Sequence, residues 1–311
     1  MPTVIEVDDV SKRYGHTLAV DHLSFTVQPG RVTGFLGPNG SGKSTTMRMI
    51  LGLDHPSTGS VRINGRPYTS YPQPIQVIGA LLDAKAADPK RTAANHLRWL
   101  AYSNGIVGAR VGEVLQLVGL GDVADAHVGT FSLGMYQRLG IAVALLGDPQ
   151  ILMFDEPLNG LDAEGIMWLR TTLKSLAAQG RTILLSSHLM SEITQTADHL
   201  VVIGRGRLLA DGPAHEIVAA HASTSVVVRA DRIAELIEHL TSKGAQIHPA
   251  DNAAVAVTGL DATTIGALAA AAGIGLNELT TREGSLEQAF LDLTHDATDY
   301  RAGTPGHAER T

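Results

Sequence analysis

A glycine-rich octapeptide constrains this chain more than any other feature: Gly37-Pro38-Asn39-Gly40-Ser41-Gly42-Lys43-Ser44. It falls between a predicted strand, residues 31–36, and a predicted helix, residues 43–51. Glycines let backbone amides approach phosphate oxygens without a Cβ in the way, and a helix start adds a partial positive charge. An unrelated glycine-rich turn would match the pattern in about 1% of such chains. The segment therefore predicts a P-loop, in which Lys43 reaches the β- and γ-phosphates of a nucleotide and Ser44 holds Mg²⁺.

Composition and charge exclude several classes of protein function. A formal net charge of −7 argues against a general nucleic-acid binder, so no nucleic-acid partner is expected. The absence of cysteine excludes disulfides and thiolate metal sites. We find no secretory signal, and the longest apolar stretch, residues 141–154, is broken by Gly147, Asp148 and Pro149. If the protein serves a membrane process, we expect another chain to cross the membrane.

The order of strand-like and helix-like segments predicts two domains. Their alternation over residues 4–224 predicts an α/β domain with a largely parallel sheet and a helical part at about 84–148. Residues 225–298 predict a small α+β domain, for which a role in stability or dimerisation is preferred to ligand binding. Its expected strands are 226–228, 245–248, 253–257 and 274–276, and its expected helices are 233–240, 262–271 and 285–293. The polar tail 299–311 is expected to be disordered.

Three further polar residues follow predicted buried strands. Asp155 and Glu156 end the apolar run 151–154, and parallel strands present this end to a ligand. Asp155 is placed to orient Mg²⁺, and Glu156 is the candidate base that polarises the attacking water. His188 follows the run 182–186 and can donate a hydrogen bond to the γ-phosphate. Taken alone, the carboxylates would be solvated charges and His188 a structural histidine, but a P-loop in the same chain favours the catalytic roles.

Further motifs resemble the ATP-binding subunit of ABC transporters over roughly residues 4–220. Phe131-Ser132-Leu133-Gly134-Met135 resembles the signature motif, at the family's spacing before Asp155. Residues 158–162, ending in Asp162, resemble the D-loop. Tyr14 occupies the position of the aromatic ring that stacks on adenine, although a surface tyrosine after a strand is common. Several motifs in the family's order are more specific than any one alone.

The resemblance implies an ATP site shared between two chains in a head-to-tail dimer, most simply a homodimer. Mg-ATP would be held by Tyr14, the octapeptide, Thr45 and Asp155, with Lys43, Glu156 and His188 in catalysis. Ser132, Gly134 and Met135 would bind the γ-phosphate on the partner, with Asp162 beside them. Ser132 also stands where a helix predicted over 135–146 needs an N-cap, and both readings hold together.

One position departs from the family pattern. The family usually carries Gln after the strand 77–82, where this chain has Asp83. A carboxylate there could take the metal, but it adds negative charge near the γ-phosphate. The loop is also where the family meets its transmembrane partner. An acidic residue at this position is similar to bacitracin- and lantibiotic-type exporters.

The subfamily resemblance concerns export. Residues 132–135, 155–162 and 286–291 are similar to ABC-2 type multidrug and antibiotic ATPases, which power a separately encoded permease. This implies work at the cytoplasmic face of the cell membrane and export of a drug, antibiotic or other amphipathic compound. An importer ATPase and a soluble ABC-type switch remain alternatives. A small-molecule kinase would not need residues 132–135 or the D-loop.

Overall fold

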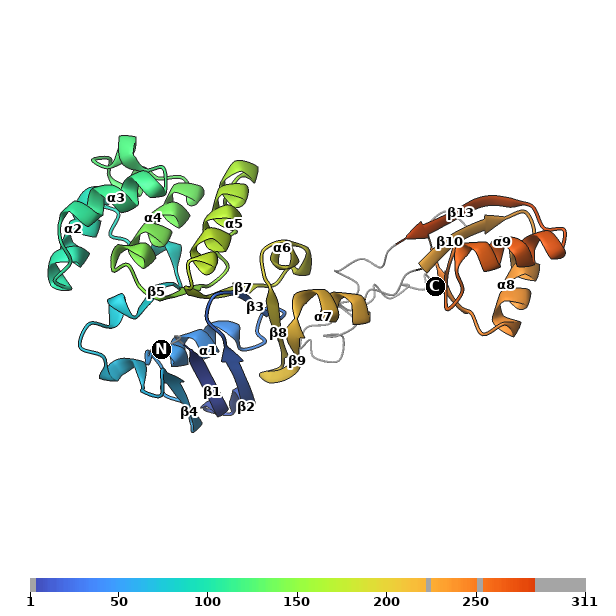
Figure 1. The fold of residues 1–311 in the computed structure, drawn as a ribbon, viewed down its shortest axis with the longest axis horizontal. Coiled ribbons are helices and arrows are strands. Elements are labelled where there is room, and N and C mark those ends of the chain that lie inside the picture. The colour runs from blue at the N-terminus through green and yellow to red at the C-terminus, as the bar shows by residue number, and fades with distance from the viewer. Residues whose placement is uncertain (1–3, 222–224, 251–253, 283–311) are drawn as a thin grey trace, which may run out of the picture. The chain divides into compact units, whose positions relative to one another are not determined.

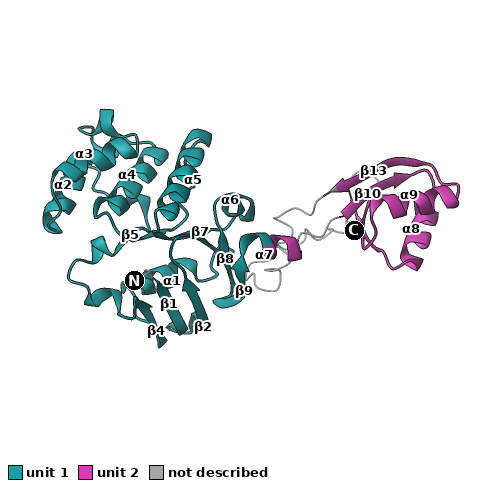
Figure 2. Ribbon diagram, viewed as in Figure 1, with its two compact units in different colours: residues 1–215, 294–311 teal, residues 216–293 magenta. Residues whose placement is uncertain are grey.

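The computed structural model describes residues 4–221, 225–250 and 254–282 (Figure 1). By its internal contacts the chain divides into a first unit that extends to His215 and a second that begins at Glu216 (Figure 2). The division falls within helix α7 (Ala214–His221), earlier than the boundary at 224 expected from the sequence. Each unit is described by itself.

A mostly parallel sheet forms the centre of the first unit. Its six strands lie in the order β5 (Ile78–Leu81), β6 (Ile151–Phe154), β7 (Thr182–Ser187), β3 (Val32–Leu36), β8 (His199–Gly204) and β9 (Arg207–Pro213). All neighbouring pairs are parallel except β8 with β9. Every residue of β3, β6 and β7 is buried, which explains why these strands read as unbroken apolar runs. The predicted α/β architecture is confirmed.

A second, antiparallel sheet was not foreseen by the sequence analysis. It has the order β2 (Thr17–Val27), β1 (Ile5–Tyr14) and β4 (Thr58–Ile63). Asp9 and His22 have positive φ angles of 48° and 51°, and the strand register shifts between Val7 and Val10. Such irregularities break the period-two alternation by which an antiparallel strand is recognised.

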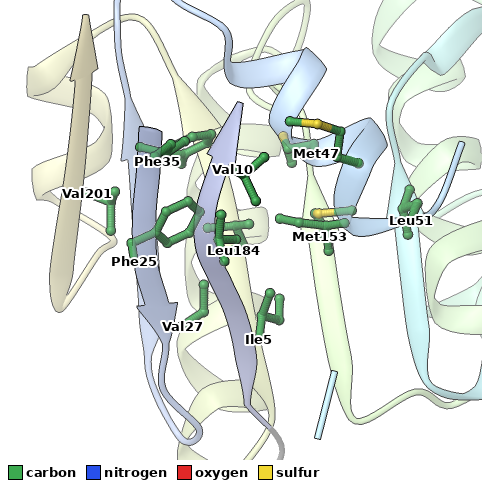
Figure 3. Close-up of a cluster of buried hydrophobic side chains, with 14 of the residues drawn as sticks. Ile5, Val10, Phe25, Val27, Phe35, Met47, Leu51, Met153, Leu184 and Val201 are labelled. Carbon is green, nitrogen blue, oxygen red and sulfur yellow. The ribbon is translucent and has the colours of Figure 1, made fainter. Parts of the chain in front are cut away.

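The main core lies between these two sheets. Figure 3 shows Val10 and Phe25 of the antiparallel sheet facing Met153 and Leu184 of the parallel sheet. The rings of Phe25 and Phe35 stack with centroids 5.3 Å apart. Helix α1 (Lys43–Ile50) contributes Met47 and Ile50 to the same cluster. The core therefore fixes both the end of β3 and the start of α1, between which the glycine-rich octapeptide runs.

Helices complete the first unit. They are α2 (Ala93–Ser103), α3 (Ala109–Leu117), α4 (Leu133–Leu146), α5 (Ala163–Ala178) and α6 (Met190–Thr194), with single 3₁₀ turns at Tyr68–Ser70, Pro74–Gln76, Ala84–Ala86, Gly121–Val123 and Val128–Thr130. Helix α4 begins at Leu133, two residues before the predicted start, because Ser132 caps it. In the part of the chain that the structure describes, no helix is long and apolar enough to cross a membrane.

The second unit is a small α+β domain, as predicted. It runs β10 (Ser225–Ala230), α8 (Ile233–Ser242), β11 (Gln246–Pro249), β12 (Val255–Thr258), α9 (Ala262–Ala271) and β13 (Leu276–Arg282), with the antiparallel sheet order β11-β12-β10-β13. Strand β13 begins at Leu276, where the expected strand 274–276 ends, and continues to Arg282 because it pairs along the whole of β10. The expected helix 285–293 and tail 299–311 lie outside the described residues.

Candidate functional site

The glycine-rich octapeptide forms an open cradle between β3 and α1. Gly40 and Gly42 have φ angles of 81° and 102°, a region that side chains rarely adopt. A Cβ on Gly42 would also lie 2.6 Å from the carbonyl oxygen of Ala19. We call the adjoining space, about 180 Å³, the phosphate-loop cavity. Its lining is Ala19, Asn39, Gly40, Ser41, Gly42, Lys43, Ser44, Thr45 and Glu156.

Lys43 is the buried cation of this cavity. Its side chain is only 5% exposed, and Nζ donates to the carbonyl oxygens of Gly37 at 2.6 Å and Pro38 at 3.3 Å. Nζ also lies 3.6 Å from Oε1 of Glu156. Burial lowers the pKa of Lys43 below its ordinary value, and the charges of Glu156 and Asp155 oppose that shift. The ammonium is therefore held at the cavity by carbonyl groups that an anion can replace as partner.

Asp155 is oriented by two hydroxyl groups. Ser44 Oγ donates to Asp155 Oδ2 at 2.6 Å, and Ser186 Oγ donates to Oδ1. The Ser186 hydroxyl also accepts a hydrogen bond from the Glu156 backbone amide at 2.9 Å. Ser186 belongs to none of the motifs that are visible in the sequence. Its register opposite Phe35, at the buried end of β7, could have indicated it.

The Ser44 and Asp155 oxygens fit Mg²⁺. This ion prefers hard oxygen ligands, and it is usually held by one or two carboxylates together with substrate phosphates and waters. A hydroxyl and a carboxylate 2.6 Å apart beside the phosphate-loop cavity are such a pair. Among the described residues, no group of three or more His, Asp or Glu gathers in the manner of a self-contained metal site.

Glu156 joins the predicted catalytic residues into one cluster. Its Oε2 lies 2.6 Å from His188 Nδ1 and accepts from Asn159 Nδ2 at 2.9 Å, while Oε1 faces Lys43. Its φ of 49° is unusual for a residue with a Cβ, so the surrounding contacts hold a strained backbone. The sequence analysis did not predict the contact with Asn159, which depends on the turn that follows β6.

The signature and D-loop residues gather around a second cavity. This signature cavity has a volume of about 310 Å³ and is lined by Ser132, Leu133, Gly134, Met135, Arg138, Gly160, Leu161 and Asp162. Ser132 Oγ accepts from the Met135 amide at 3.3 Å and caps α4, and Asp162 accepts from Gly165 at 2.8 Å and caps α5. The two cavities share no lining residue. The predicted γ-phosphate binders therefore line a different cavity from the phosphate loop of the same chain.

Tyr14 and Asp83 lie outside both cavities. The ring of Tyr14 is 46% exposed, its hydroxyl donates to Asp54 at 2.8 Å, and Lys12 Nζ lies 4.9 Å from the ring centroid. Asp83 Oδ1 accepts from the Lys85 amide at 2.8 Å and so caps the 3₁₀ turn Ala84–Ala86. The structure therefore gives Asp83 no hydrogen bond to the cluster around Asp155.

Asp83 instead lines a largely apolar groove of about 450 Å³, which we call the α2 groove. Its wall includes the exposed side chains of Leu53 and Trp99 and the buried ring of His96. Nδ1 of His96 has no hydrogen-bond partner among the described residues. Burial lowers the pKa of His96, and the charge of Arg91 lowers it further.

A phosphate-binding loop with a strand-end carboxylate pair on a parallel sheet defines the chain as a P-loop NTPase. The family described as "ABC transporter" matches residues 20–159, and residues 224–287 match a family described only as a domain of unknown function. The chain belongs to the ABC transporter family. It is an ATP-binding subunit, and the ATP-binding subunits of this family are ATPases coupled to transport.

Two relatives and one solved structure indicate how far the likeness extends. The Nod factor export ATP-binding protein I of Cupriavidus metallidurans is 35% identical over 302 residues, 94% of this chain and 98% of the relative. The bacitracin transport ATP-binding protein BcrA of Bacillus licheniformis is 44% identical over 216 residues, 68% and 71% of the two chains. A structure titled as an ATP binding subunit of an ABC transporter has a TM-score of 0.64 at 30% identity, and the match covers 70% of this chain and 92% of that one.

Proposed function

We propose that two copies of this chain form two composite ATP sites and power a separately encoded permease that exports an amphipathic compound. One observation carries the dimer. Lys43, Glu156 and His188 meet at the phosphate-loop cavity, whereas Ser132 opens on a cavity with a different lining. A second copy in head-to-tail orientation supplies the missing half to both sites through one symmetric interface.

Each composite site divides its work between the chains. One copy holds the phosphates through the amides of residues 37–45 and through Lys43, and Tyr14 lies against the adenine. The partner contributes Ser132, Gly134, Met135 and Asp162 to the γ-phosphate side. Glu156 accepts the proton of the attacking water, and His188, which lies 2.6 Å from that carboxylate, donates to the γ-phosphate.

Ser44 and Asp155 are the residues that would hold Mg²⁺, since their oxygens already lie 2.6 Å apart. When bound, the ion neutralises charge on the β- and γ-phosphates. Ser186 keeps Asp155 turned toward Ser44 through its hydrogen bond to Oδ1.

The permease is proposed to dock in the α2 groove. Leu53 and Trp99 are 57% and 53% exposed and line the same groove, and Asp83 lies beside them. This interaction would hold the chain at the cytoplasmic face of the cell membrane. Two relatives named for Nod factor export and bacitracin transport support an export role over an importer.

The composite site is tested by mixing two variants, each of which is defective in one half of the site. Lys43→Ala removes the phosphate-loop half, and Ser132→Ala removes the signature half. A mixed dimer contains one site with both defects and one site with neither, so the mixture should form an ATP-dependent dimer that neither variant forms alone, as size-exclusion chromatography measures. Co-purification from membranes should yield the permease with the chain. A mixture that stays monomeric with ATP, like either variant alone, would contradict the head-to-tail arrangement.

A further inference from the structure

A buried glutamine connects the two cavities within one chain. Gln137 lies on α4, in the second turn after Ser132, and is only 6% exposed. Its Nε2 donates to the backbone oxygen of Asn159 at 3.0 Å and to that of Glu156 at 3.4 Å. Its Oε1 is buried and has no hydrogen-bond partner among the described residues. A carboxamide buried with one end unpaired is costly, so stability alone does not account for the choice of glutamine.

The backbone that Gln137 holds carries the proposed base. Glu156 has a left-handed φ of 49°, and the backbone N–H of Asn159 donates to the backbone oxygen of Glu156 at 3.3 Å. The Asn159 side chain then donates to the Glu156 carboxylate at 2.9 Å. Gln137 binds both backbone oxygens of this turn, so its position sets where the carboxylate points.

The same helix carries the signature residue. Ser132 is the N-cap of α4, and five residues of helix separate it from Gln137 by roughly 7.5 Å. A short helical stretch of this kind moves as one body, because its backbone hydrogen bonds resist bending. A shift of the helix start toward a ligand therefore shifts the Gln137 carboxamide and the turn that it holds.

We infer that Gln137 is a positioning residue that makes catalysis at one ATP site depend on ATP at the other. This rests on the proposed composite dimer, in which Ser132 of one chain binds the nucleotide held by its partner. When Ser132 is engaged, α4 and Gln137 set Glu156 of the same chain, which serves the opposite site. ATP bound at one site can shift the Glu156 carboxylate of the other site only if it binds better to one position of α4. The contact between ATP and Ser132 supplies that preference.

The test compares Gln137→Met and Asn159→Ala with wild type in the full chain. Methionine keeps the length and burial of Gln137 but removes its donor. We expect kcat to fall about tenfold through misplacement of the base, with KM for ATP unchanged within about twofold. The Hill coefficient for ATP should fall from above 1 to about 1. Because both residues act on one turn, the double variant should lose no more than the more impaired single variant.

Gln116→Met, at an exposed position of α3, controls for the glutamine-to-methionine change away from residues 156–159. Unchanged kcat and Hill coefficient in Gln137→Met would overturn the inference, as would an equal loss in Gln116→Met. If Gln137→Met does not fold, Asn159→Ala takes its place in the test, because the Asn159 side chain is exposed and its loss should not prevent folding. A wild-type Hill coefficient in Asn159→Ala would then contradict the inference.

Two measurements separate failure of this inference from failure of the proposed function. A wild-type chain without an ATP-dependent dimer would contradict the composite site itself. Glu156→Gln combined with Gln137→Met should still dimerise on ATP, which shows that any loss of kcat in Gln137→Met comes from positioning and not from lost assembly.

Discussion

The phosphate-loop cavity and the signature cavity lie in the same unit, but they hold their polar groups in different ways. In the first, Lys43, Glu156 and His188 satisfy one another in contacts of 2.6 to 3.6 Å, and the lysine is buried. In the second, the side chains of Ser132 and Asp162 accept hydrogen bonds from backbone amides in the first turns of α4 and α5. Leu133 beside them is 49% exposed.

This difference suggests how work divides between the halves. A charged cluster stabilised within the chain keeps its geometry before any ligand arrives, and removing one member leaves a buried charge unpaired. A helix cap at the surface costs little to exchange, because water or a ligand can take over the same groups. The cluster at the phosphate-loop cavity is therefore preorganised, whereas the capping groups at the signature cavity can exchange partners.

The largest effect is expected where the preorganised half is broken. Glu156→Gln keeps the size of the side chain but cannot accept the proton, so turnover should fall by about 10²- to 10⁴-fold. ATP affinity should persist, because residues 37–45 are untouched, and a closed dimer should accumulate. Steady-state ATPase assays and size-exclusion chromatography with ATP measure the two outcomes. Hydrolysis at the wild-type rate would contradict the assignment of Glu156 as the base.

A smaller effect is expected in the signature half. Ser132→Ala would remove the proposed hydrogen bond to the γ-phosphate held by the partner, which should reduce turnover by roughly tenfold to a hundredfold. It also removes the α4 cap, which should lower the free energy of unfolding by about 1 kcal/mol. ATPase assays and denaturant unfolding measure the two losses separately.

Thr92→Ala provides the control for this prediction. Thr92 caps α2 by accepting from the Asn95 amide at 3.2 Å, nearly the geometry of Ser132, but it lines neither cavity. The two variants should lose similar stability, whereas only Ser132→Ala should lose turnover. Equal turnover in both would mean that Ser132 acts as a cap alone.

The same contrast explains what the sequence could predict. Lys43, Asp155, Glu156 and His188 each follow a local pattern, a glycine-rich loop or the end of an apolar strand, and such patterns are visible in a single sequence. Their gathering follows from the parallel order of β3, β6 and β7, which brings equivalent strand ends to one edge.

Residues that act through tertiary contacts were not visible. Ser186 matters because β7 lies beside β6, and Gln137 matters because α4 packs near the turn after β6. Neither contact leaves a periodic or motif signal of its own. The antiparallel sheet was missed for a related reason, because bulges at Asp9 and His22 interrupt the alternation.

The smallest effect is expected away from both cavities, at His96 in the α2 groove. His96→Leu removes a buried nitrogen, Nδ1, that has no hydrogen-bond partner among the described residues. The free energy of unfolding at neutral pH should therefore stay level or rise by up to about 1 kcal/mol. ATPase activity of the isolated subunit should not change, since His96 lines neither cavity.

The pH dependence sharpens this prediction. The pKa of His96 lies below its ordinary 6.5 in the folded chain, so on acidification the unfolded chain takes up its proton first. The contribution of neutral His96 to the free energy of unfolding is therefore complete above about pH 6.5, and it is lost as the pH falls toward the pKa of the folded chain. Urea unfolding of wild type and His96→Leu between neutral and acidic pH should therefore show a shallower acid loss in the variant. Parallel curves would mean that the His96 ring titrates alike in the folded and the unfolded chain, which would contradict the lowered pKa.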